Sequence, residues 1–193
     1  MQVTTLLRTL LVCLLAPAAL ALAQDSKPTA AAPAPDRPPT AFNKRAYGFV
    51  KATLLRSAEK MPEENYGFKP ADSVRSFGQI VGHVADSHYF FCSVVLGEKS
   101  PAPKIDKTKA SKADLIASLK DAFAYCDKAY DGMTDASALE TVKLFKDDMP
   151  KRDVLAANAM HGVEHYGNLI VYLRMKNIVP PSSEPGFMPE PKK

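Results

Sequence analysis

Hydrophobic residues recur at three- and four-residue steps along four stretches of the chain, which is the spacing of one apolar face of a helix. These stretches predict helices over residues 42–61, 76–96, 112–133 and 150–176. Residues 141–145 could pair as a short strand, but we expect an unpaired extended segment there. Four helices with apolar faces, and no pattern of a larger sheet, predict an all-α fold, a four-helix bundle.

Residues beside the apolar stretches mark where the helices begin and end. Ser76 with Gln79 three residues later fits a capping box, and Ser111 suits the N-cap of the third helix. Gly97 is suited to end the second helix. The connection over residues 98–111 is longer than adjacent antiparallel helices need. We therefore leave the order of the helices in the bundle open.

The first 23 residues predict a signal peptide that takes no part in the fold. Arg8 is their only charge, and the apolar run that follows ends in small residues at Ala21 and Ala23. This run is too short for an ordinary membrane span. We expect cleavage before Gln24 and export to the periplasm or the extracellular space. An uncleaved membrane anchor is the alternative.

Proline-rich segments flank the expected folded domain at residues 42–180. Residues 24–41 are rich in Pro and Ala, which favours extended, solvated chain and predicts a disordered tether. Residues 181–193 are expected to form a proline-rich C-terminal tail. Of the 193 residues, 46% are hydrophobic and 24% charged, an ordinary globular composition. The basic residues behind the net charge of +4 are scattered, so we expect no nucleic-acid partner, and no stable membrane span after signal cleavage.

The candidate chemistry centres on His161 and His165. Their spacing of four residues puts both on one face of the last predicted helix, where two imidazoles can share one metal ion. Asn158 and Asn168 lie on the same stripe, between apolar residues, and buried polar groups need partners. His83, beside the apolar stripe of the second helix, is the candidate third ligand.

Three neutral imidazoles suit a divalent metal ion, either Zn, Ni or Fe, with an open coordination position. A closed site would need a fourth protein ligand, for which Cys126 is the core-facing candidate. We interpret His88 as a surface or rim histidine. The pattern from His161 to His165 also satisfies the inverted zinc-protease motif, in which Glu164 would activate water.

The run from Ser73 to Asp86 and the run from His161 to Arg174 resemble two helices of the DinB family. The resemblance extends over about residues 42–185 and includes the closing segment at 178–182. It implies a four-helix bundle that holds a metal ion on three histidines, here His83, His161 and His165. The metal varies within the family, and some relatives transfer or isomerise substrates with a low-molecular-weight thiol.

Three functions remain open at this stage. The first is a metal-dependent enzyme, a hydrolase or thiol-type transferase acting on an unknown small molecule. The second is a non-enzymatic metal or small-ligand binding protein, and the third is a bundle that forms a homodimer through its helix faces. Glu164, Ser87 and Tyr166 are the candidate general bases. For Cys92 and Cys126 we favour two free thiols over a disulfide, which an oxidising compartment would also allow. Cys126 lies on the core face of its helix, and we expect Cys92, which adjoins Phe91, to be partly exposed.

Overall fold

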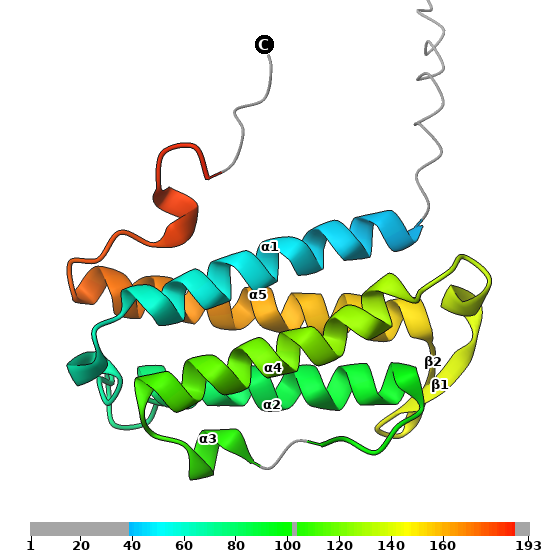
Figure 1. The fold of residues 1–193 in the computed structure, drawn as a ribbon, viewed down its shortest axis with the longest axis horizontal. Coiled ribbons are helices and arrows are strands. Elements are labelled where there is room, and N and C mark those ends of the chain that lie inside the picture. Colours follow the sequence, from blue (N-terminus) through cyan, green and yellow to red (C-terminus); the bar gives the residue numbers. More distant parts are fainter. Residues whose placement is uncertain (1–38, 102–103, 188–193) are drawn as a thin grey trace, which may run out of the picture. The chain divides into compact units, whose positions relative to one another are not determined.

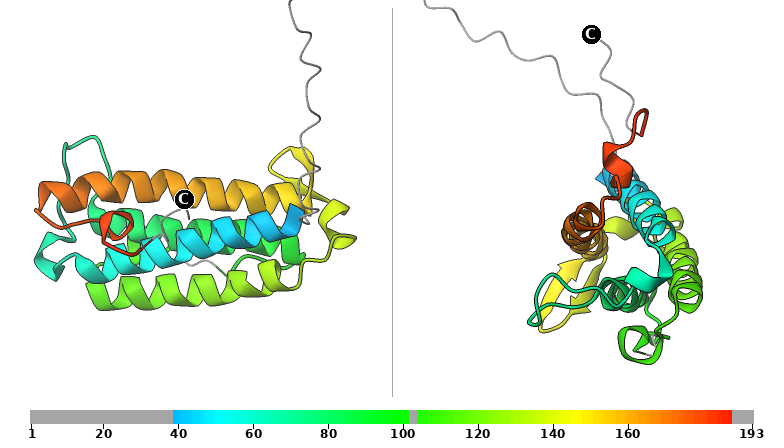
Figure 2. Two further views of the ribbon diagram at one scale, coloured as in Figure 1. Left: turned by 90° about the horizontal axis from the view of Figure 1, so that it is seen from above. Right: turned by 90° about the vertical axis from the view of Figure 1, so that its left-hand side faces the viewer.

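Four long helices pack side by side in the structure, a computed structural model that describes residues 39–101 and 104–187 (Figures 1 and 2). The predicted signal peptide and most of the predicted tether lie outside the described residues. The long helices are α1 (Pro39–Lys60), α2 (Phe77–Leu96), α4 (Lys112–Asp131) and α5 (Lys151–Met175). They confirm the predicted all-α four-helix bundle, although α1 begins at Pro39 and so takes in the last residues assigned to the tether.

Short elements connect these helices. They are η1 (Glu63–Asn65), α3 (Ile105–Thr108), η2 (Ser137–Leu139), β1 (Thr141–Leu144), β2 (Asp147–Pro150) and η3 (Pro181–Ser183). The predicted caps are present, since Ser76 and Gln79 form a capping box and Gly97 ends α2 with a φ of 70°. Among the described residues, no helix combines the length and the apolar character needed to cross a membrane.

The helices do not follow a simple up-and-down order. α2 packs against α4 and α5, and α1 packs against the same two helices. Asn43 of α1 donates a hydrogen bond to the carbonyl of Arg152, and Val50 lies against Gly162, so α1 and α5 run parallel. α2 and α4 run in the opposite direction (Figure 1). The long connection between them therefore carries the chain back along the bundle.

This connection contains α3, which the sequence pattern did not predict. The backbone amides of Ile105 and Asp106 donate to the two carboxylate oxygens of Asp86 on α2, at 2.9 and 3.1 Å. At Gly82, an added Cβ would lie only 2.8 Å from the Cα of Asp106. α3 is therefore fixed closely against α2, beside the position of His83.

β1 and β2 form an antiparallel hairpin, where we expected an unpaired extended segment. Thr141 pairs with Pro150 and Leu144 with Asp147, which leaves Phe145 and Lys146 as the turn. The expectation was wrong because β2 consists of Asp, Asp, Met and Pro, residues that mostly have low strand propensity. Contacts of the hairpin with α2 and α5 are a tertiary effect that local propensity does not reveal.

Cys92 of α2 and Cys126 of α4 are joined by a disulfide, so the preference for two free thiols was wrong. Both residues are fully buried and their Cα atoms lie 5.3 Å apart. We had expected Cys92 to be partly exposed, but α2 also packs against α4 and buries that side of the helix. The disulfide removes Cys126 as a fourth metal ligand.

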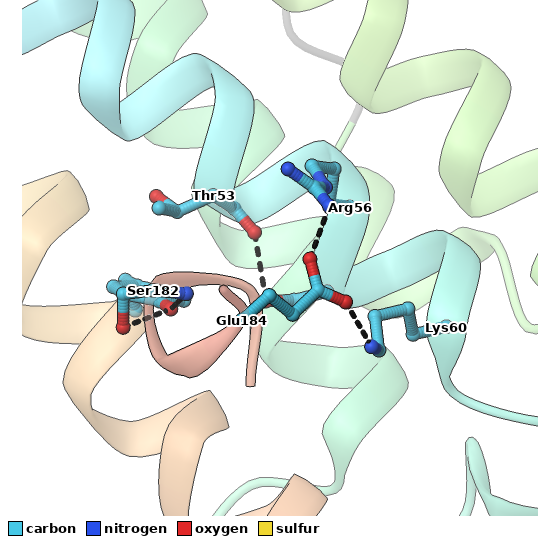
Figure 3. Close-up of polar contacts among 7 residues, drawn as sticks. Thr53, Arg56, Lys60, Ser182 and Glu184 are labelled. Atoms are coloured by element: carbon cyan, nitrogen blue, oxygen red, sulfur yellow. Dashed lines mark hydrogen bonds and ion pairs between the residues drawn. The ribbon is translucent and has the colours of Figure 1, made fainter. Parts of the chain in front are cut away.

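Residues 181–187 are attached to the bundle (Figure 3). The backbone amide of Ser182 donates to the hydroxyl of Tyr166 at 2.8 Å, and that hydroxyl donates to the Ser182 Oγ at 2.7 Å. The carboxylate of Glu184 accepts hydrogen bonds from two basic residues of α1, Arg56 and Lys60. This part of the predicted proline-rich tail therefore ties the end of α5 to α1.

Candidate metal centre

Three histidines from two antiparallel helices meet between α2 and α5. His83 lies near the middle of α2, and His161 and His165 lie one turn apart on α5. The Nε2 atoms of His83 and His161 are 3.3 Å apart, and those of His161 and His165 are 3.1 Å apart. One nitrogen from each ring lies within 4.8 Å of the other two. The fold thus brings together the three histidines that the sequence singled out.

These distances suit a shared ion better than hydrogen bonds between the rings. A neutral imidazole nitrogen carries either one hydrogen or one lone pair, so His161 Nε2 can bond only one of its two neighbours at a time. A zinc ion binds imidazole nitrogens at about 2.0–2.1 Å, which puts two tetrahedral ligand atoms about 3.3 Å apart. The donor set therefore fits a divalent ion that keeps an open position.

The protein environment favours the neutral form of all three rings. Burial is the main cause that lowers the pKa of His83, His161 and His165. For His165 the pKa falls to about 3, because His161, His83 and the guanidinium of Arg75 add to the effect of burial. Metal ligands must be unprotonated, so a lowered pKa keeps these nitrogens available in mildly acidic solution.

The Nδ1 atoms of His165 and His161 differ in their hydrogen-bond partners. The side-chain amide nitrogen of Asn168 lies 3.3 Å from His165 Nδ1. An imidazole that binds metal through Nε2 carries its hydrogen on Nδ1, and a half-turn of the amide would present its oxygen to that hydrogen. His161 Nδ1 is buried without a hydrogen-bond partner among the described residues. Asn168 is therefore the side chain placed to orient a ligand ring.

His88 was predicted to be a surface or rim histidine, but it is fully buried. Its Nδ1 donates to the carbonyl of Val84 at 2.9 Å, and its ring packs against Phe123 with centroids 4.6 Å apart. The prediction was wrong because turning away from His83 around α2 leads into the interface with α4 and not into solvent. His88 is not a member of the three-histidine cluster.

In the part of the chain that the structure describes, none of the three candidate general bases hydrogen-bonds to a ring of the cluster. Glu164 is exposed, and the Tyr166 hydroxyl is engaged with Ser182. The Ser87 hydroxyl donates to the backbone carbonyl of His83 at 2.8 Å. The inverted zinc-protease interpretation, which needs Glu164 beside the metal, gains no support from this geometry.

Two cavities border the cluster, one between α2 and α5 and the other between α2, the start of α3 and the hairpin. The first, of about 660 Å³, is lined in part by His165, Asn168 and Arg75. The second, of about 620 Å³, lies beside His83 and His161, and we call it the phenylalanine cavity because three phenylalanines line it, Phe90, Phe91 and Phe145. Both volumes are typical of small-molecule sites. An open metal position would thus be next to space for a substrate.

Sequence reasoning missed the phenylalanine cavity. A signal was present in Phe90 and Phe91, because two neighbouring large residues on a helix cannot both face the same core. Phe145 gave no such signal, since its segment was expected to be unpaired. Its place beside α2 depends on the hairpin, and the hairpin depends on tertiary contacts.

Comparison with known proteins agrees with this architecture. Over 123 residues the chain is 27% identical to YjoA of Bacillus subtilis (strain 168), described as uncharacterized, covering 61% of this chain and 77% of that protein. The fold is similar to that of a solved DinB-like protein from Bacillus cereus, with 18% identity and a TM-score of 0.56 over 72% of this chain and 93% of that one. The solved DinB-like protein YjoA from Bacillus subtilis gives 22% identity and a TM-score of 0.58, over 70% and 92%. Residues 46–169, more than half of the chain, match the model of the DinB superfamily, and the chain therefore belongs to that superfamily.

Proposed function

We propose that this chain binds one divalent metal ion through the Nε2 atoms of His83, His161 and His165 and acts as a metal-dependent enzyme on a small molecule. The observation that carries the proposal is the convergence of the three nitrogens, two pairs of them at 3.1 and 3.3 Å, beside two cavities. Zn, Ni and Fe in the divalent state all accept imidazole ligands. When bound, such an ion supplies Lewis acidity and lowers the pKa of a water or a thiol at its open position.

The chain's own residues would bind and orient the substrate. Arg75 brings a cationic group to one cavity, and the three phenylalanines bring apolar surface to the other. Asn168 contacts the back of the His165 ring and can hold its orientation. With a metal-activated water or thiol as the nucleophile, the reaction would be hydrolysis or thiol transfer.

A non-enzymatic protein that binds a metal ion or a small ligand is the second candidate. The observation in its favour is that Glu164 is exposed and the Tyr166 hydroxyl is bonded to Ser182. Neither residue is then placed to move a proton at the cluster. If the metal-loaded protein binds its ion with one-to-one stoichiometry but turns over no ester, amide or thiol substrate in a broad screen, this candidate is the better one.

Metal content decides whether the site is assigned correctly. We expect one divalent ion per chain in the purified protein and loss of that ion in each of the variants His83→Ala, His161→Ala and His165→Ala. The control is His88→Leu, which replaces a buried histidine outside the cluster by an apolar residue of similar size. Elemental analysis that finds metal retained in His161→Ala, or lost equally in His88→Leu, would contradict the assignment.

We also propose that the chain is exported. The apolar run that ends at Ala23 and the Pro- and Ala-rich residues 24–41 support this, as does the disulfide between Cys92 and Cys126, since disulfides persist in oxidising compartments. Intact mass of the protein from its native host should correspond to a chain that begins near Gln24. A chain that keeps Met1 and stays in the cytosolic fraction would contradict export.

A further inference from the structure

A row of aromatic rings leads from the tip of the hairpin to the candidate metal centre. The ring centroids of Phe145 and Phe90 are 5.2 Å apart, and those of Phe90 and Phe91 are 5.3 Å apart. Phe91 in turn lies 5.9 Å from the ring of His161. All four rings line the phenylalanine cavity. The cavity thus has a continuous aromatic wall that ends at a candidate metal ligand.

Phe145 occupies an unfavourable backbone conformation at the outer end of this row. Its φ is 55°, and the residue is 75% exposed. It is the first of the two residues in a tight hairpin turn, a position that usually takes Gly, Asn or Asp. A bulky residue at positive φ in a turn is uncommon, and such strain often accompanies functional sites. Since the exposed ring adds little to the core, a ligand contact is the better reason for its presence.

Lys104, which also lines the cavity, likewise has a positive φ. Its φ is 58°, it is exposed, and it immediately precedes α3. Asp86 holds the start of α3 through the backbone amides of Ile105 and Asp106, which fixes the backbone beside Lys104. Among the described non-glycine residues, positive φ occurs at three positions, Lys104, Phe145 and Asn177, and two of them line this one cavity.

The preference of the cavity for an anionic group comes from the candidate metal site. In the lining itself, the positive charges of Lys104 and Lys107 balance the negative charges of Asp86 and Asp106. At the inner end, three neutral imidazoles would leave the charge of a divalent ion uncompensated, which favours an anion at its open position. This last step rests on the proposed metal site.

We propose that the phenylalanine cavity binds a small organic anion with an aromatic body. Its ring packs along Phe91, Phe90 and Phe145, and its anionic group points to the metal held by the three histidines. Lys104 also lines the cavity. The cavity volume of about 620 Å³ accommodates a molecule of this kind.

The test is a ¹⁹F NMR titration with 4-(trifluoromethyl)phenylacetate, run on the metal-loaded protein and on the same protein treated with chelator. Phe145→Gly should weaken binding about fivefold or more in both forms, because it removes an aromatic contact while relieving the turn. The matched control is Phe42→Ala, which removes another exposed phenylalanine, 65% exposed, on α1. Equal affinity of Phe145→Gly and the unaltered chain, or no binding at all, would overturn the aromatic part of the proposal.

The preference for an anion is tested by comparing an acidic probe with a neutral one. In the metal-loaded protein, the neutral probe 4-(trifluoromethyl)phenylacetamide should bind about fivefold or more weakly than the acid, and chelator should make that difference smaller. Lys104→Gly should weaken binding of the acid, because it removes a positive charge from the cavity lining. Lys143→Gln on β1, which lies outside the lining, should leave that binding unchanged. Equal binding of acid and amide would overturn the anion preference. If no metal binds, the proposed function fails, yet the dependence on Phe145 in the chelated protein still decides whether the aromatic site exists.

Discussion

Gly162 of α5 lies against Val50 of α1, and an added Cβ at position 162 would be only 2.4 Å from the Cγ1 of Val50. Two carbon atoms that are not bonded cannot lie this close together. The absence of a Cβ at position 162 therefore allows α1 and α5 to approach each other. Gly162 directly follows His161 and precedes His165 by three residues. The close contact between α1 and α5 therefore sets the position of both histidines.

Replacing Gly162 by Ala should push α5 away from α1 and disturb the metal centre. We expect the free energy of unfolding to fall by about 1–3 kcal/mol, the usual effect of overpacking a core. Metal affinity should fall too, because α5 carries two of the three ligands. Chemical denaturation and a metal titration on the same variant measure the two effects.

Gly167→Ala is the matched control on the same helix. No atom lies within 4 Å of a Cβ added there, so the substitution meets no neighbour. Alanine is the better helix former by about 1 kcal/mol, so stability should stay the same or rise. Equal losses in the two variants would mean that the contact with Val50 does not set the position of α5.

Asn168 should affect metal affinity without being a ligand. Its amide lies 3.3 Å from His165 Nδ1, which must carry the hydrogen when Nε2 binds the ion. We expect Asn168→Leu to weaken metal binding about 10- to 100-fold, the usual effect of removing such a partner. Because Asn168 is exposed, the melting temperature of the metal-free protein should hardly change.

Asn168→Asp separates an orienting role from a purely structural one. The carboxylate still accepts a hydrogen bond from Nδ1–H, so this variant should restore the affinity that Asn168→Leu loses. A metal titration on the three proteins gives the answer. If the Asp and Leu variants bind the ion equally weakly, Asn168 does not act through its acceptor.

The sequence was informative where local periodicity alone determines the structure. The four long helices, the cap at Ser76 and the end at Gly97 each follow from residues within one turn of the chain. The three histidines could be selected because two lie at helical spacing and the third lies beside an apolar stripe. Their convergence also needed α2 and α5 to be adjacent and antiparallel, which periodicity does not reveal. The resemblance to a known family implied only that the three histidines hold one metal ion.

The sequence was misleading where packing between elements decides. His88 and Cys92 lie on a side of α2 that faces α4, so both are buried although their distance from the apolar stripe suggested exposure. Phe145 reaches the site only through the hairpin, whose second strand has little strand propensity of its own. These errors share one cause, since the helix order was unknown and no single stretch reveals its neighbours.

His88 should make the fold sensitive to acid. Burial lowers its pKa to about 4, more than the hydrogen bond to Val84 raises it. Between the unfolded pKa of about 6.5 and the folded value, only the unfolded chain takes up the proton. Stability should therefore fall as the pH drops from about 6.5 to about 4, by about 3 kcal/mol from this residue.

His88→Leu should remove that share of the pH dependence. We would measure the free energy of unfolding from pH 7 to pH 4 for both proteins in excess chelator, so that release of metal at low pH does not enter. Between pH 7 and pH 4, the free energy of unfolding of the variant should fall by about 3 kcal/mol less than that of the unaltered chain. Parallel curves would mean that His88 is protonated as readily in the folded protein as in the unfolded one.

The disulfide between Cys92 and Cys126 should be closed in the mature protein, which we propose is exported, and should stabilise it. The measurement uses a chain that begins at Gln24 and therefore lacks Cys13. Alkylation under denaturing conditions should label neither cysteine without reductant and both cysteines after reduction. The bridge spans 34 residues, which corresponds to about 3–4 kcal/mol of stability in the chain-entropy estimate. Reduced protein and the double variant Cys92→Ala/Cys126→Ala should both melt at lower temperature than the oxidised chain. Labelling of both cysteines without reductant, or a melting temperature that reductant leaves unchanged, would show that the fold does not depend on this bridge.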